Sequence, residues 1–172
     1  MDPIAPEPGH LATPEARKRG APKSARRRAR EAAMQGLYEW LIAATPVGDI
    51  DAHMRELDGF GKCDMAHFEA LLNGCIEQAS AIDAILAHHL DRAVTRLSPV
   101  EHAVLMIGTF ELWHCMDIPY KVAINEAVEL AKGFGGTDGH KYVNGVLDKA
   151  AVELRPAEVQ AARDQARLLR DA

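Results

Sequence analysis

The strongest constraint on the fold is a pair of helical patterns joined by a glycine-rich turn, between Asp117 and Arg155. Apolar residues recur with the spacing of one helix face on both sides of the turn. Those residues are Ala123, Ala127, Leu130, Ala131 and Phe134 before the turn, and Val143, Val146, Leu147, Ala150 and Leu154 after it. Because each apolar face has to be buried against a neighbour, the sequence predicts a tight helix–turn–helix corner.

The turn supplies residues that end one helix and begin the next. The first helix is expected to end through positive φ angles at Gly133, Gly135 and Gly136. Thr137 and Asp138 are candidates to cap the second helix. The first turn of that helix is crowded with polar side chains, namely Asp138, His140, Lys141, Tyr142 and Asn144. Since a helix N-terminus carries free N–H groups and partial positive charge, this corner can hold a phosphate.

Composition and the other periodic segments favour an all-α fold. Aromatic residues make up only 5% of the 172 residues, alanine-rich helical patterns dominate, and 48% hydrophobic content suffices for one core. Further helices are expected to begin at Ser24, Asp64 and Ser98, the last with a Ser-Pro-Val-Glu capping box. The segment 100–116 is apolar on almost every side, as in a central helix, and Gly108 is expected to permit close helix contact there. We therefore predict an all-α, single-domain helical bundle.

Several classes of function lack support in the sequence. Cys63, Cys75 and Cys115 have no metal-ligand or C-x-x-C spacing and are expected to be reduced thiols of a cytosolic protein. No apolar run reaches membrane-spanning length, and residues 1–10 have neither the basic nor the apolar region of a secretory signal. No phosphate loop, nucleophile elbow or metal spacing is present, so we predict no catalytic site, no metal and no cofactor.

Charge is distributed very unevenly along the chain. Residues 17–30 contain eight Lys or Arg and no acidic residue, although the whole chain has a net charge of −5. A basic arm on an acidic body is typical of a protein that binds a polyanion. We divide the chain into a disordered basic tail at 1–23, a helical domain at 24–155 and a polar extension at 156–172, whose packing the sequence leaves open.

The basic arm runs into the first turns of the helix expected from Ser24. Cations there oppose the helix dipole, so a chain selected only for stability would not cluster them. Arginine binds phosphate bidentately, and Gln and Tyr can hydrogen-bond to bases or stack on them. The residues predicted to bind nucleic acid in this region are Lys23, Arg26, Arg27, Arg28, Arg30, Gln35 and Tyr38. The alternative is a solvated basic helix start that serves solubility only.

Three stretches of the chain resemble the NusB family of bacterial transcription antitermination factors: ARRRAREAAMQGLYEW, PYKVAINEAVELAKGFG and KYVNGVLDKAA. The resemblance covers residues 24–155 and implies an all-helical bundle of about seven helices. It also implies a non-enzymatic, cytoplasmic protein that binds boxA RNA, chiefly of ribosomal RNA operons. Its partner would be NusE, a small-subunit ribosomal protein, within an RNA polymerase antitermination complex.

The resemblance also assigns roles to individual residues. It adds Asp138, Lys141 and Tyr142 to the RNA contacts, beside the first helix. It places Glu101 and Tyr120 on a NusE face apart from the arginine cluster, and it leaves open a homodimer formed through the RNA surface.

Two other interpretations stay open. The same helical domain resembles the N-terminal domain of ribosomal-RNA cytosine methyltransferases, but that function needs a following α/β domain with a glycine-rich cofactor loop, which we do not expect here. A protein–protein adaptor without RNA binding would leave the arginine cluster unexplained. The chain departs from the NusB pattern at Gly139, where a serine is common, so the capping geometry of the second corner helix stays open.

Overall fold

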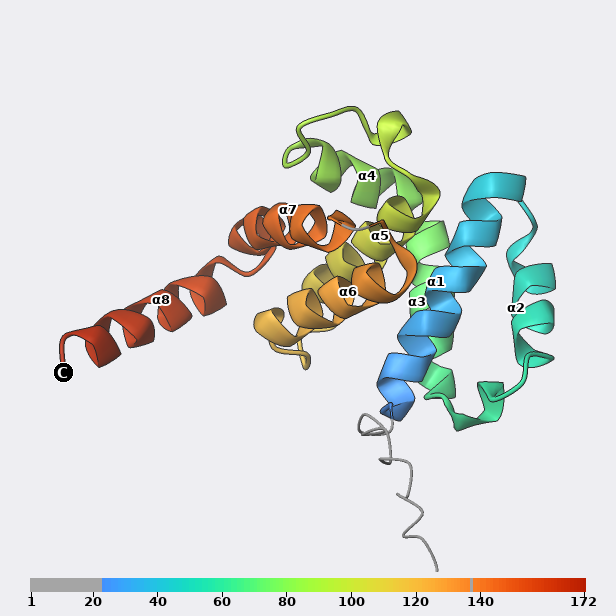
Figure 1. Cartoon of the computed structure of the whole chain (residues 1–172), viewed down its shortest axis with the longest axis horizontal. Coiled ribbons are helices and arrows are strands. Elements are labelled where there is room, and N and C mark those ends of the chain that lie inside the picture. The colour runs from blue at the N-terminus through green and yellow to red at the C-terminus, as the bar shows by residue number, and fades with distance from the viewer. Residues whose placement is uncertain (1–22, 137) are drawn as a thin grey trace, which may run out of the picture.

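The computed structural model describes residues 23–136 and 138–172, and the regular structure in these ranges is helical (Figure 1). The elements are α1 (Ala25–Ala43), α2 (Val47–Arg55), η1 (Phe60–Lys62), α3 (Met65–Glu77), α4 (Ala79–Ala87), η2 (Val94–Arg96), α5 (Pro99–His114), α6 (Tyr120–Phe134), α7 (Gly139–Leu154) and α8 (Pro156–Arg170). The predicted all-α bundle is confirmed, with eight α-helices in these ranges where the resemblance implied about seven.

Three helix starts are fixed by side-chain caps at the predicted residues. The side-chain oxygens of Ser24, Asp64 and Ser98 each accept a hydrogen bond from the backbone N–H group three residues later, at 3.1, 3.0 and 3.2 Å. Each bond satisfies one of the N–H groups that an α-helix leaves free at its start. The start of α1, and with it the position of the arginine cluster, is therefore encoded locally.

Helix α5 is the centre of the bundle. Its residues 103–107 and Leu112 are fully buried, and it contacts α1, α3, α4, α6 and α7. Figure 1 shows α6 and α7 as neighbours, with α1 and α3 together on the other side of the molecule. Among the described helices none is long and apolar enough to cross a bilayer.

Gly108 lets α5 approach α6 and α7 closely, as predicted. A Cβ atom at this position would lie 2.6 Å from Cδ1 of Leu147 and 3.3 Å from Cβ of Ala127. Real Cβ atoms do not approach side chains to the first of these distances, so any larger residue has to displace Leu147. The packing of three helices therefore depends on the missing side chain.

The corner between α6 and α7 differs from the prediction in two respects. Gly133 lies within α6, and Gly135, the C-cap of α6, has φ −93° and ψ −179°, so its backbone is extended and not left-handed. A Cβ at Gly135 would lie 2.7 Å from the carbonyl oxygen of Ala131, so close approach explains this glycine. Asp138 occupies the N-cap position of α7 but makes no side-chain capping bond within the described residues. The other predicted cap, Thr137, lies outside them.

The C-terminal extension forms α8, which is anchored by one buried arginine. The guanidinium of Arg155 donates hydrogen bonds to four backbone carbonyls at the end of α5 and in the following loop, at 2.6–3.1 Å: those of Glu111, Leu112, Cys115 and Ile118. Val159 is buried in the first turn of α8, and the rest of the helix extends away from the bundle (Figure 1). These contacts hold only the N-terminal end of α8 against the bundle.

Candidate nucleic-acid interface

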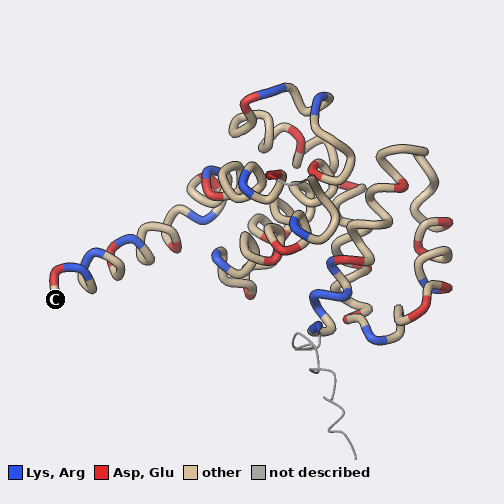
Figure 2. Tube along the Cα trace, in the orientation of Figure 1, with Lys and Arg blue, Asp and Glu red and all other residues tan. Residues whose placement is uncertain are grey.

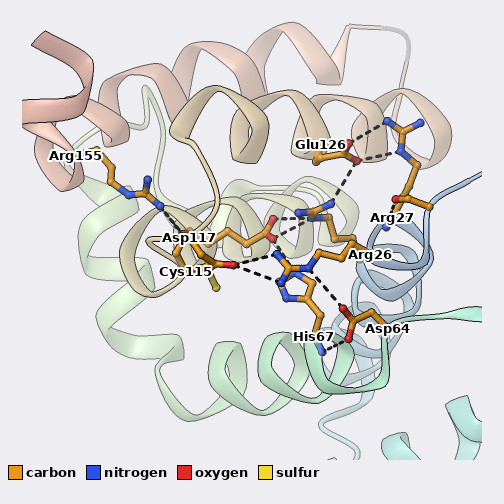
Figure 3. Close-up of polar contacts among 11 residues, drawn as sticks. Arg26, Arg27, Asp64, His67, Cys115, Asp117, Glu126 and Arg155 are labelled. Atoms are coloured by element: carbon orange, nitrogen blue, oxygen red, sulfur yellow. Dashed lines mark hydrogen bonds and ion pairs between the residues drawn. The ribbon is translucent and has the colours of Figure 1, made fainter. Parts of the chain in front are cut away.

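The basic residues at the start of α1 lie at one end of the bundle (Figure 2). They face carboxylates that come from the start of α3, from the loop between α5 and α6, and from α6 (Figure 3). These partners are far away in sequence. Asp117 follows Arg26 by 91 positions and Glu126 follows Arg27 by 99. No local sequence signal could have found them.

Arg26 lies between two carboxylates. Its terminal nitrogens are both 3.4 Å from one oxygen of Asp117, and its Nε is 3.5 Å from Oδ2 of Asp64. The pKa of Asp64 is lowered, chiefly by the hydrogen bond from the backbone N–H of His67 and further by the charge of Arg26. These are long contacts between partly exposed groups, and such pairs contribute little to stability. The Arg26 side chain is 44% exposed and can therefore turn toward a phosphate.

Arg27 makes a closer, bidentate contact with Glu126. The distances are 3.0 Å from Nε to Oε2 and 3.1 Å from Nη2 to Oε1. The hydrogen bond and the charge of Glu126 raise the pKa of the Arg27 guanidinium above its ordinary value. This arrangement of two parallel N–H···O bonds is also the one in which arginine holds phosphate. The partly exposed Arg27 guanidinium therefore already holds an anion, the Glu126 carboxylate, in this geometry.

Arg30 lies one turn deeper and is 3% exposed. Its Nε donates to both oxygens of Glu111 at 2.9 and 3.0 Å, and His67 contacts the same carboxylate at 2.8 Å. Burial alone would raise the pKa of Glu111, but the hydrogen bonds from His67 and Arg30 outweigh it and lower the pKa. The predicted contact between Arg30 and RNA does not fit this position, because the guanidinium is buried in the interior.

Lys23 and Arg28 complete the cluster on α1. Lys23 pairs with Glu31 at 2.7 Å. Arg28 is half-buried and, together with Gln35, lines a cavity of about 130 Å³ against the loop that follows α2. In the described part of the chain no carboxylate lies within ion-pair distance of Arg28. Among these arginines, Arg28 is therefore the one that needs no carboxylate displaced before it binds an anion.

Gln35 and Tyr38 line a different surface of α1, an apolar groove of about 380 Å³. Tyr38 is 40% exposed and shares this groove with Phe134, at the end of α6, which is 42% exposed. The remaining lining residues are Met34, Glu39, His53, Met54, Leu57 and Val100. A groove with two exposed aromatic rings and few charges is better suited to apolar side chains than to phosphates.

The corner residues gather with a segment that sequence reasoning missed. The Tyr142 hydroxyl donates to Oδ1 of Asp91 at 3.0 Å, and the guanidinium carbon of Arg92 lies 4.3 Å from the centre of the Tyr142 ring. Hydrogen bonds from Arg92 and Tyr142 lower the pKa of Asp91. Lys141 pairs with Asp138 at 3.4 Å. Arg92 in turn pairs with Asp91 at 2.7 Å, so both cations of the corner, Lys141 and Arg92, are neutralised by neighbouring carboxylates. Tyr142 meets Arg92 instead of the arginines of α1.

The two residues expected on one NusE face, Glu101 and Tyr120, lie on different helices, each near the start of its own helix. Glu101 is in the first turn of α5, where its Oε1 lies 3.4 Å from the position of a Cβ on Gly139. Tyr120 is the first residue of α6, and its backbone N–H donates to Glu158 of α8 at 2.9 Å. Glu101 therefore borders the corner, whereas the resemblance implies a face set apart from the RNA residues.

Comparison with known proteins decides the family. The sequence model of the NusB family matches residues 27–152, which span α1 through nearly all of α7. The chain belongs to the NusB family. The match includes Arg27, Arg30, Glu111 and Glu126 and stops before α8, so the extension lies outside the part that the NusB family shares.

Relatives and solved structures agree with this assignment. The chain is 58% identical over 142 residues to the transcription antitermination protein NusB of Cupriavidus pinatubonensis, covering 83% of this chain and 85% of the relative. It is equally identical over 142 residues to that of Burkholderia cenocepacia, covering 83% and 98%. The T. maritima NusB structure matches with a TM-score of 0.68 at 31% identity, over 78% of this chain and 96% of that one. A structure of NusB and NusE in complex with double-stranded RNA matches with a TM-score of 0.65 at 25% identity, over 74% and 96%.

Proposed function

We propose that this NusB-family protein is a transcription antitermination factor that binds boxA RNA together with NusE in an RNA polymerase complex. The observation that carries the proposal is the cluster of Lys and Arg at the N-terminus of α1, where the helix dipole disfavours cations. The relatives named above are antitermination proteins, and one matching structure contains NusB, NusE and RNA. The protein acts in the cytoplasm, without catalysis and without a cofactor.

The RNA surface is divided between two patches of residues. Arg26, Arg27 and Arg28 at the start of α1 hold phosphates, since arginine and phosphate match in charge and geometry. Lys141, Tyr142 and Arg92 form the second patch, where the partly exposed aromatic ring of Tyr142 stacks on a base. Arg30 supports the first patch from inside through Glu111.

NusE takes the apolar groove between α1, α2 and the end of α6. Tyr38 and Phe134 are exposed there, Glu39 also lines the groove, and Glu101 follows the lining residue Val100 in the chain. Exposed aromatic rings are the usual anchors of a protein interface, and an acidic rim attracts a basic ribosomal protein. Tyr120 is a further contact only if the partner also reaches the opposite end of α6. A homodimer through the RNA surface would exclude RNA and is an alternative state of the same protein.

The test is a titration of fluorescently labelled boxA RNA with the full chain, with and without NusE, at several salt concentrations. We expect salt-dependent binding to boxA RNA that NusE tightens, and weaker binding to an RNA of shuffled sequence. Glu101→Lys should weaken NusE binding, whereas the matched substitution Glu77→Lys, on the exposed side of α3, should not. Equal affinity for boxA and shuffled RNA, with no effect of NusE, would contradict the proposal.

A further inference from the structure

A cleft of about 360 Å³ lies between α1 and the second half of α6, next to the arginine cluster. Its lining residues are Lys23, Arg27, Glu31, Glu126, Glu129, Leu130, Lys132, Gly133 and Phe134. Every cation in this lining is paired with a carboxylate in the same lining. The pairs are Lys23–Glu31 at 2.7 Å, Arg27–Glu126 at 3.0 Å and Lys132–Glu129 at 3.3 Å. The cleft is large enough for part of a nucleotide, but its charges are internally neutralised.

We infer that this cleft is a phosphate subsite of the RNA surface and that the Glu126 carboxylate occupies it in the free protein. RNA would then bind by exchange, with a backbone phosphate taking the place of Glu126 on the Arg27 guanidinium. The inference rests on the proposed function and adds to it a residue that limits RNA affinity.

The contact between Arg27 and Glu126 has the geometry of an arginine bound to phosphate. Nε and Nη2 of Arg27 each donate to a separate oxygen of Glu126, at 3.0 and 3.1 Å (Figure 3). A phosphate offers the same pair of acceptor oxygens with a similar spacing. The Arg27 side chain is 38% exposed, so a phosphate can reach it from solvent.

A second arginine, Arg30, lowers the free-energy cost of separating Glu126 from Arg27. Glu126 is 18% exposed, and a carboxylate this buried is costly to leave without a partner. Nη1 of Arg30 lies 3.7 Å from Oε2 of Glu126, and Arg30 is itself held by Glu111. When Arg27 turns toward a phosphate, Glu126 therefore keeps a cationic neighbour. Within the described residues neither Glu31 nor Glu129 has such an arginine, and each pairs with a lysine nearby in sequence.

The test compares Glu126→Gln with wild type in titrations of labelled single-stranded boxA RNA, at about 0.05 M and about 0.2 M salt. The substitution keeps the shape and removes the competing charge, so the affinity should rise about two- to fivefold at the lower salt. The gain should shrink at the higher salt, because screening already weakens the competing pair. Glu129→Gln is the matched control, since it removes the same charge one turn further along α6 without releasing an arginine. Equal gains from both substitutions would overturn the inference.

A double substitution isolates the role of Arg27. In an Arg27→Ala background, Glu126→Gln should give no gain, because no guanidinium is left to release. A gain that persists there, or weaker RNA binding by Glu126→Gln alone, overturns the inference. If Arg27→Ala weakens RNA binding but Glu126→Gln leaves it unchanged, only the inference is refuted. If the wild type binds no RNA, the proposed function itself is refuted. If Glu126→Gln does not fold, the shorter Glu126→Asp replaces it, and absence of any gain is then the refuting result.

Discussion

Arg30 and Glu111 form a buried ion pair that joins α1 to the central helix. The Nε atom of Arg30 lies 2.9 and 3.0 Å from the two carboxylate oxygens of Glu111, and their side chains are 4% and 0% exposed. His67 of α3 contacts the same carboxylate, so three helices meet at one charge. The pair fixes how the start of α1, with its exposed arginines, sits on the bundle.

Removing one member of this buried pair should destabilise the protein strongly. Glu111→Gln leaves the buried Arg30 charge with only the more distant carboxylate of Glu126, at 3.7 Å. Breaking a buried ion pair in this way typically costs about 3–5 kcal/mol of unfolding free energy. Urea denaturation followed by circular dichroism measures the change. Glu69→Gln, which breaks the exposed pair with Arg55, is the control and should leave the midpoint almost unchanged. Similar midpoints for both variants would show that the buried pair is not structurally important.

Glu111 should also make the protein sensitive to acid. Its folded-state pKa lies below the ordinary 4.5 because the hydrogen bonds from His67 and Arg30 outweigh burial. A lowered pKa contributes stability that is complete above the unfolded value and is lost as the pH falls through the folded value. Unfolding free energy should therefore decrease below about pH 4.5, and more steeply in wild type than in Glu111→Gln. Parallel pH profiles for the two proteins would contradict this assignment.

Arg28 should contribute directly to RNA affinity. It is the arginine of the α1 cluster that has no ion-pair partner among the described residues, so its charge is available without exchange. Arg28→Ala should weaken boxA binding and lower the slope of log affinity against log salt by about 0.7, the value for one contact to a single strand. Arg163→Ala, on the exposed side of α8, removes the same charge and should leave the slope unchanged.

Asp138 should restrain RNA binding at the corner. Its side chain is 79% exposed, pairs with Lys141 at 3.4 Å and does not cap α7 in the described part of the chain. Asp138→Asn should therefore leave the melting temperature unchanged and tighten RNA binding by up to about fivefold at low salt. The gain should decrease as salt screens the repulsion between the carboxylate and phosphate. Weaker binding by the variant at both low and high salt would identify Asp138 as a direct contact.

Any side chain at Gly108 should lower the free energy of unfolding. Gly108→Ala puts a methyl group 2.6 Å from Leu147 in the centre of the bundle, and overpacking of this kind costs about 1–3 kcal/mol. Gly145→Ala is the matched control on α7, because a Cβ atom there would meet no described neighbour within 4 Å outside its own helix backbone. That control should gain about 0.5–1 kcal/mol from helix propensity. Thermal unfolding of both variants measures the two opposite shifts.

Much of the fold could be predicted because the relevant signals are local. The capping residues Ser24, Asp64 and Ser98 and the apolar segment 100–116 act through neighbours within one or two helical turns. The same reasoning failed at Gly135, where a predicted positive φ is instead a close contact with the Ala131 carbonyl. Sequence shows that a glycine is present but not which steric demand it meets.

The sequence by itself determined that basic residues gather at the start of a helix in an acidic, all-helical NusB-family chain. Only the tertiary structure decided what each arginine does. Arg26, Arg27 and Arg30 are close neighbours in sequence, yet one is loosely held by Asp117, one is bidentate with Glu126 and one is buried on Glu111. The physical reason is that burial and charge pairing depend on helices from distant parts of the chain, and an ion pair acts only between groups that the fold has brought within a few ångströms.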